Sequence, residues 1–135
     1  MRYQRAESPA LLNGFDAAHR FFASCFEHED RSRERLWVAH LDDETRCIHL
    51  ERYDGDTATA ELPIRSIVRD AARFGSAGVV IAHNHPSGDP SPSKADCRAP
   101  RELARAGETI DLAIVDHLIF GGSSGCRSMR RMGLL

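Results

Sequence analysis

The sequence of 135 residues lacks several features that would assign it to a particular class of protein. No apolar run approaches the ~20 residues of a membrane helix, and no charged and apolar secretory leader is recognisable. The four cysteines are widely spaced and form no Cys-x-x-Cys pair, which argues against the zinc site of nucleoside deaminases. We therefore expect a cytoplasmic protein with reduced cysteines and no contact with a membrane.

The sequence also lacks an excess of basic charge. Lys94 is the single lysine, and a net charge of −2 provides no general attraction to nucleic acid. The arginines form two local clusters, one at helical spacing within residues 98–105 and one within residues 127–131. Such clusters are ordinarily solvated surface, but two clusters on either side of one cleft would favour an anionic substrate.

Length and composition indicate one domain. A chain of 135 residues can enclose one hydrophobic core and is too short for two. Its 41% hydrophobic and 28% charged residues are ordinary for a globular protein, and it contains no repeat or low-complexity tract. We expect a single domain over residues 1–135, with an N-terminal helix and loop in 1–32 and the metal-binding core in 33–135.

Hydrophobic periodicity and turn residues predict the elements of this domain. Pro100 lies inside one expected helix and should kink it or shorten its first segment. The order helix, strand, strand, helix, strand, helix, strand, strand predicts an α/β fold with helices on the faces of a mixed sheet. The expected elements are a helix from Ser8 to about Glu27, strands at about 36–41 and 46–53, a helix at about 64–74, a strand at 77–82 continuing into the histidines, a helix from Ser93 to Gly107, and strands at about 111–120 and 126–129.

The most informative segment runs from His83 to Asp96. It follows a short apolar, β-branched run at residues 77–82, which is typical of a buried strand. Because strand residues two apart share one face, His83 and His85 can point at the same place. Open α/β sheets bind their ligands at this carboxyl end of a strand.

A stiff loop and a helix start complete the segment. The prolines and glycine of residues 86–92 prevent regular structure, so this stretch should fold back over the histidines. Ser93-x-x-Asp96 alone would be read as a capping box at a helix N-terminus. Combined with two histidines, Asp96 completes a ligand set for one catalytic zinc ion, with water in the fourth position. We therefore predict that His83, His85 and Asp96 bind one Zn²⁺ per chain.

The spacing H-x-H, seven residues, Ser, two residues, Asp resembles the signature of the JAMM/MPN metallo-isopeptidases. Residues 83–96 are similar, almost letter for letter, to the RadC branch of that superfamily, with weaker similarity at 63–65, 116–121 and 128–135. The resemblance covers about residues 33–135. It implies a JAMM/MPN domain, related to the cytidine-deaminase fold, and zinc metallopeptidase activity. Full-length RadC proteins also carry a helix-hairpin-helix region that is not recognisable here, so we expect their DNA-repair association to transfer poorly.

The resemblance further implies a carboxylate that acts without binding the metal. JAMM enzymes use an upstream glutamate as general base and acid, and Glu34, at the start of the segment 34–41, matches it. Ser93 would stabilise the oxyanion or the bound water, in addition to capping its helix. His117 is expected to be a partly buried, hydrogen-bonded histidine and not a ligand. Three nearby residues are alternatives for the base: Glu27, Glu29 and Glu44.

Three functional hypotheses follow. The leading one is a zinc-dependent hydrolase that cleaves amide or isopeptide bonds in a protein or peptide substrate. The alternative is a RadC-like DNA-associated module, either a DNA-binding domain or a metal-dependent nuclease, which would depend on the arginine clusters. A third is a non-enzymatic MPN scaffold, although such domains generally lack the ligand set present here. Exposed edge strands of a small mixed sheet would also allow a homodimer.

Overall fold

The computed structural model describes residues 9–53, 62–122 and 125–135. Its elements appear in the order expected from the sequence, which confirms the α/β class, and one short 3-10 helix is added. Among the described residues, no helix combines the length and apolar character needed to cross a bilayer. The elements are α1 (Phe15–Phe26), β1 (Leu36–Leu41), β2 (Cys47–Tyr53), α2 (Ile64–Phe74), β3 (Gly78–Asn84), α3 (Lys94–Gly107), η1 (Glu108–Ile110), β4 (Ala113–Phe120) and β5 (Cys126–Ser128).

The five strands form one mixed sheet in the order β2-β1-β3-β4-β5. Strands β3 and β4 are parallel, whereas the other neighbouring pairs are antiparallel. β3 is the central strand and is buried along its whole length. Because β3 and β4 run in the same direction, the loops that follow them leave from the same edge of the sheet.

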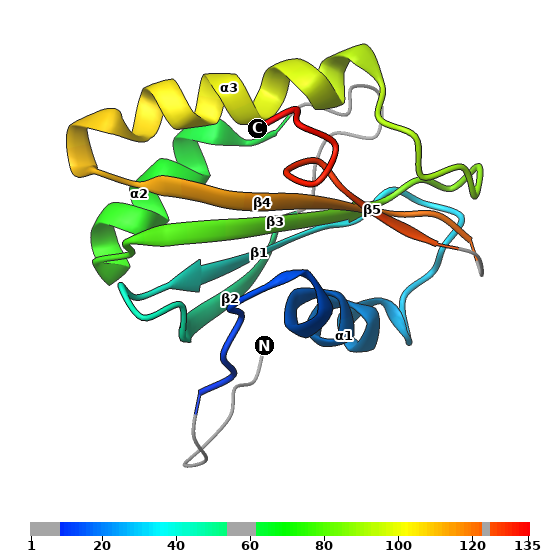
Figure 1. Cartoon of the computed structure of the whole chain (residues 1–135), viewed down its shortest axis with the longest axis horizontal. Helices are drawn as coiled ribbons and strands as arrows, with labels where there is room; N and C mark the ends of the chain where they lie inside the picture. Colours follow the sequence, from blue (N-terminus) through cyan, green and yellow to red (C-terminus); the bar gives the residue numbers. More distant parts are fainter. Residues whose placement is uncertain (1–8, 54–61, 123–124) are drawn as a thin grey trace.

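Helices cover both faces of the sheet, with α1 on one side and α2 and α3 on the other (Figure 1). Phe22 of α1 packs in the cluster that contains the even-numbered residues of β3, while Leu103 of α3 packs with the odd-numbered ones. This alternation is the period of two expected of a strand buried on both faces. By the same alternation, His83 points to the side covered by α2 and α3.

The first helix is shorter than the sequence predicted. It begins at Phe15, so the prediction of helix was wrong for residues 9–14, and Ser8 lies outside the described residues. The backbone carbonyl of Ala10 accepts a hydrogen bond of 2.8 Å from Cys47 N–H, and Leu12 N–H donates to the Thr45 carbonyl over 2.9 Å. These bonds to the β1–β2 hairpin use backbone groups that a helix would otherwise need.

The helix α3 is continuous from Lys94 to Gly107, so the expected shortening at Pro100 was wrong. Pro100 is buried, and its ring packs on the protein side of the helix. β4 begins at Ala113 instead of Asp111, because Asp111 has a left-handed backbone (φ 54°) that ends the 3-10 turn. The four cysteines are all free, as expected.

Candidate metal centre

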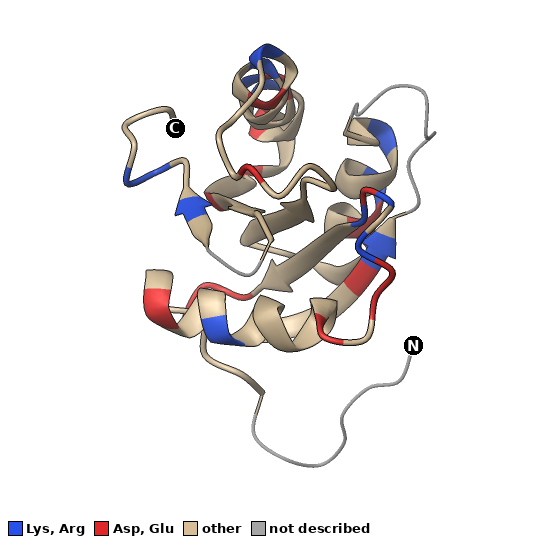
Figure 2. Cartoon of the chain, turned by 90° about the vertical axis from the view of Figure 1, so that its right-hand side faces the viewer, with Lys and Arg blue, Asp and Glu red and all other residues tan. Residues whose placement is uncertain are grey.

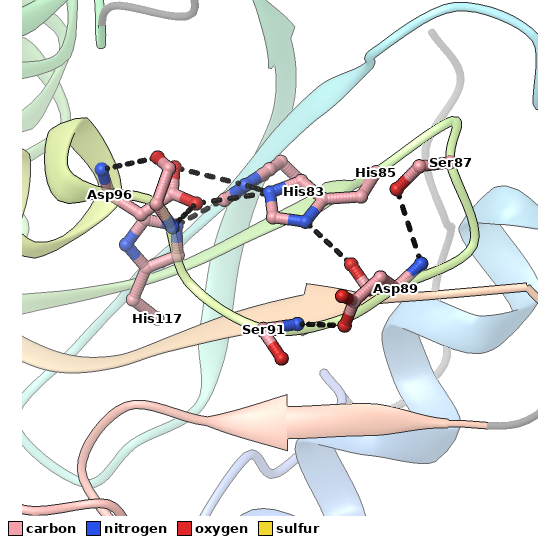
Figure 3. A network of polar contacts seen from close by, with 8 residues as sticks. His83, His85, Ser87, Asp89, Ser91, Asp96 and His117 are labelled. Atoms are coloured by element: carbon pink, nitrogen blue, oxygen red, sulfur yellow. Dashed lines mark hydrogen bonds and ion pairs between the residues drawn. The ribbon is translucent and has the colours of Figure 1, made fainter.

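Two histidines converge at the carboxyl end of β3. His83 is the penultimate residue of the strand and His85 follows its last residue. Their Nε2 atoms lie 3.1 Å apart (Figure 3). His83 is buried and His85 is half-buried, so the pair lies where β3 reaches the surface.

The helix α3 brings a carboxylate to the same place. Asp96 is 4% exposed, and its Oδ1 lies 3.3 Å from the Nε2 of His83 while its Oδ2 lies 3.0 Å from the Nε2 of His85. The same residue forms the capping box, in which Asp96 Oδ2 accepts from Ser93 N–H (2.8 Å) and Ser93 Oγ accepts from Asp96 N–H (3.0 Å). The capping box is therefore confirmed, and it also holds the carboxylate against both imidazoles.

The loop after β3 fixes the tautomer of His85. Its Nδ1 lies 2.8 Å from the backbone carbonyl of Asp89 (Figure 3). A carbonyl can only accept, so Nδ1 carries a proton and donates it. In the neutral ring this leaves the Nε2 lone pair directed at His83 and Asp96. The loop itself is tied to the end of β4 by a bond of 3.0 Å from Gly122 N–H to the Gly88 carbonyl.

A third histidine supports His83 from β4. The Nε2 of His117 lies 2.8 Å from the Nδ1 of His83, and His117 is 1% exposed. Burial lowers the pKa of His117 well below its usual value, so its ring is neutral and can accept a hydrogen bond from His83 Nδ1–H. That arrangement frees the Nε2 of His83 for a metal. Sequence reasoning did not place His117 here, although its segment, residues 116–121, was among those that resemble RadC proteins.

Glu34 reaches the two histidines from the segment before β1. Glu34, His83 and His85 can each provide one ligand atom, and these atoms all lie within 4.8 Å of one another. The antiparallel register pairs Leu36 with His83, so a residue two positions before Leu36 comes beside His85. Glu34 is exposed, whereas the other members of the group are buried or half-buried.

The three other glutamates considered as bases lie elsewhere. The Glu29 carboxylate is 3.3 Å from the guanidinium of Arg52, and the Glu44 carboxylate is 2.7 Å from that of Arg46. Glu27 is exposed at the end of α1. None of the three belongs to the group at the end of β3, as far as the described residues extend.

The charges of the site favour a bound cation. Burial opposes ionisation of Asp96, but hydrogen bonds from His83 and His85 outweigh it and hold the pKa of this carboxyl well below its usual value. The hydrogen bond to Asp96 in turn raises the pKa of His85. A metal cation bound here would replace the ring protons that now face Asp96 and would contact the Nε2 lone pairs and the carboxylate directly.

The spacing of these donor atoms fits zinc. Tetrahedral zinc with bonds of about 2.0–2.1 Å separates its ligand atoms by about 3.3 Å. The two Nε2 atoms are 3.1 Å apart, and each lies near a different oxygen of Asp96, His83 Nε2 at 3.3 Å from Oδ1 and His85 Nε2 at 3.0 Å from Oδ2. Two imidazoles and one carboxylate are also a donor set that zinc prefers. The residues present therefore fit a single zinc ion.

Two further residues of the predicted pattern have structural partners. Ser93 is the exposed N-cap of α3, and because its Oγ accepts from Asp96 N–H, its hydroxyl proton is available to donate. Buried Asp116 accepts hydrogen bonds from Ser128 Oγ (2.6 Å) and from Arg130 N–H (3.1 Å). Asp116 thus joins β4 to β5 and the segment that follows it.

Within residues 9–53, 62–122 and 125–135, the arginines do not gather into one basic surface. In Figure 2 the lysine and arginine positions are scattered among acidic ones. The Arg130 guanidinium donates to the backbone carbonyls of Ile114 and Val115, and the Arg131 guanidinium lies 4.4 Å from the centre of the Phe15 ring. Two side chains of the C-terminal cluster are therefore used within the chain. A surface for an anionic substrate stays a prediction.

Comparison with known proteins identifies relatives with the same domain. The family model described as "RadC-like JAB domain" matches residues 12–134, so the match includes α1 and begins earlier than the resemblance at 33–135. The chain is 33% identical to UPF0758 proteins of Stenotrophomonas maltophilia strains K279a and R551-3, over 86% of its own length and 58% of theirs. It is 35% identical to a UPF0758 protein of Vibrio cholerae, over 91% of its length and 75% of that protein. The chain thus spans little more than half of the Stenotrophomonas proteins, and it belongs to the RadC-like JAB domain family.

Proposed function

We propose that the chain is a zinc-dependent hydrolase of amide bonds, a peptidase or isopeptidase that acts on a protein or peptide substrate. The observation that carries this proposal is the convergence of His83 Nε2, His85 Nε2 and the Asp96 carboxylate, with Glu34 beside them. The family supports it, because JAB domains include metalloproteases. A protein that only served as a scaffold would have no need for these buried donors.

In this proposal His83, His85 and Asp96 hold the zinc ion. Bound zinc supplies a Lewis acid and lowers the pKa of a water ligand to about 7. Glu34, an exposed carboxylate next to the donor atoms, would serve as general base toward the attacking water and as general acid toward the leaving amine. Ser93 donates its hydroxyl proton to the oxyanion of the substrate.

The assignment of Asp96 as ligand and Glu34 as base rests on how deeply each carboxylate is buried and on the hydrogen bonds that restrain it. Asp96 is 4% exposed and is held by two capping-box bonds, so little conformational entropy remains for it to lose on binding a metal. Glu34 is exposed and faces the open side, where water and substrate arrive. A base must reach solvent to exchange its proton, whereas a ligand need not.

The first test is the metal content of protein purified without chelator, measured by mass spectrometry. We expect about one zinc per chain in the wild type, loss of zinc in His85→Ala, and wild-type content in the control His28→Ala, whose side chain is 90% exposed. Peptide and isopeptide substrates would then be screened, with Glu34→Gln as the inactive control. A wild type that contains no metal and takes up no added zinc would overturn the proposal.

A further inference from the structure

One buried side chain holds both peptide neighbours of Glu34. Asn84 lies between the two histidines and is 3% exposed. Its Oδ1 accepts a hydrogen bond of 2.6 Å from Arg35 N–H, and its Nδ2 donates one of 3.0 Å to the backbone carbonyl of Arg33. Because Glu34 stands between these two residues, the amide of Asn84 fixes the backbone on either side of it.

The hydrogen bonds from the Asn84 side chain are needed because the segment that carries Glu34 lies beyond the end of the β1–β3 ladder. Leu36 and His83 are the last paired residues of β1 and β3 on this side, and beyond them Asn84 N–H still reaches the Arg35 carbonyl over 3.4 Å. The β1–β3 ladder does not continue beyond this point, and Glu34 itself is exposed. The Asn84 side-chain amide supplies a donor and an acceptor, as a peptide group does, and so replaces the missing ladder bonds to the backbone of Arg33 and Arg35.

We propose that Asn84 is a positioning residue for Glu34, an inference that rests on the proposed function. β3 then sets two parts of the site at once. His83 points to one side of the strand as a ligand, while the next residue, Asn84, ties down the segment that carries the base. The side-chain hydrogen bonds of Asn84 go to the backbone of Arg33 and Arg35 and not to a proposed metal ligand, so its role is separate from metal binding. A loosened base would lose the geometry that proton transfer requires.

The experiment measures how much the Glu34 charge shifts the pH midpoint at which the water ligand of bound Co²⁺ ionises, in proteins with and without Asn84. The protein is loaded with Co²⁺, whose visible spectrum reports ionisation of its water ligand, and the pH midpoint is recorded. Glu34→Gln removes a negative charge beside that water, so the midpoint should fall by about one pH unit when Asn84 is present. In the Asn84→Ala background the same Glu34→Gln change should shift the midpoint by less than half as much.

This comparison separates positioning from a merely structural role. Asn84→Ala should still bind one Co²⁺ per chain, and Asn13→Ala, at an exposed position before α1, should leave the full shift intact. If Asn84→Ala does not fold, Asn84→Asp is used. It keeps the acceptor for Arg35 N–H and replaces the donor to Arg33 by a carboxylate oxygen, and its added charge is present in both proteins whose midpoints are compared. A change of the protein's stability alone would not alter the difference between the two midpoints.

The possible failures are distinguishable. If Glu34→Gln shifts the pH midpoint equally in the wild-type and Asn84→Ala proteins, and each binds one Co²⁺, the positioning role of Asn84 is wrong and the proposed metal site is unaffected. A wild type that binds no Co²⁺, or a Glu34→Gln protein without any shift, overturns the proposed function and this inference together.

Discussion

Asp96 combines two tasks in one carboxylate, since it caps α3 and contacts both histidines. We predict that Asp96→Asn weakens zinc binding by at least about 100-fold, because a neutral amide replaces a charged ligand, while Glu34→Gln changes it by no more than a few-fold. Competition with a chromophoric chelator measures both affinities. The opposite result, loss of zinc in Glu34→Gln alone, would make Glu34 the third ligand.

His117 contacts the proposed metal ligand His83. Its Nε2 lies 2.8 Å from the Nδ1 of His83, and His117 is 1% exposed. We predict that His117→Phe, which keeps a ring and removes the acceptor, lowers zinc affinity by about 10- to 100-fold. The same chelator competition measures it, with His28→Phe at an exposed position as the matched control. Unchanged affinity in His117→Phe would show that the bond does not orient His83.

At the level of elements, the local features of the chain were predictable. The apolar run of β3, the stop of α2 at Gly75 and the capping box at Ser93 each depend on a few neighbouring residues. The non-helical residues 9–14 were not predictable, because their backbone bonds go to residues 45–47. Such long-range pairing overrides a local helix signal.

The same distinction holds for the candidate site. The motif fixed the spacing of His83, His85 and Asp96, so their convergence could be anticipated from strand and helix geometry. The contacts of His117 with His83, and of Asn84 with Arg33 and Arg35, depend on which strands pair and in what register. A single sequence, considered without an alignment, contains no direct signal of which residues pair across the strands.

The loop after β3 depends on a close approach at Gly121. A Cβ there would collide with the Gly88 carbonyl oxygen and would lie 2.8 Å from Pro90 Cδ. We predict that Gly121→Ala displaces this loop, breaks the bond from His85 Nδ1 to Asp89, and lowers zinc affinity by about tenfold. Gly14→Ala is the control, because a Cβ at Gly14 meets nothing within 4 Å. Equal zinc affinities in the two variants would contradict this role of the loop.

Another buried histidine, His40, joins β1, β2 and the end of α2. His40 Nδ1 lies 3.0 Å from Ser76 Oγ and His40 Nε2 lies 3.2 Å from the Tyr53 hydroxyl, which donates to Asp70 over 2.6 Å. Burial lowers the pKa of His40 to about 4, from 6.5 in the unfolded chain. The folded state therefore holds this ring neutral over a range in which the unfolded chain takes up a proton.

The sign of the pH effect follows from that difference. Above pH 6.5 His40 is neutral in both states, and as the pH falls toward 4 protonation favours the unfolded chain, at a cost of up to about 3 kcal/mol. We predict that His40→Gln loses less stability than the wild type between pH 6.5 and 4, as measured by urea unfolding. His28→Gln, at an exposed site, should follow the wild type. Parallel curves for wild type and His40→Gln would contradict the buried neutral ring.

For the whole molecule, the candidate ligands couple metal binding to folding. His83 and His85 lie at the end of the central strand, Asp96 in a helix on one face, and Glu34 in the segment before β1. The unfolded chain does not hold these groups together, so a zinc ion at the proposed site would bind the folded state preferentially. Zinc should then stabilise the entire domain and not only the loop around the site.

The size of this stabilisation can be estimated for a free zinc concentration of about 100 times the dissociation constant. Binding to the folded state alone then contributes about 2.7 kcal/mol, which corresponds to a rise of about 10 °C in the unfolding midpoint of a chain of this length. Calorimetry with and without zinc measures it, and chelator should reverse it. His85→Ala should show little rise. If zinc raised the midpoint of His85→Ala as much as that of the wild type, the stabilising site would lie elsewhere than at the end of β3.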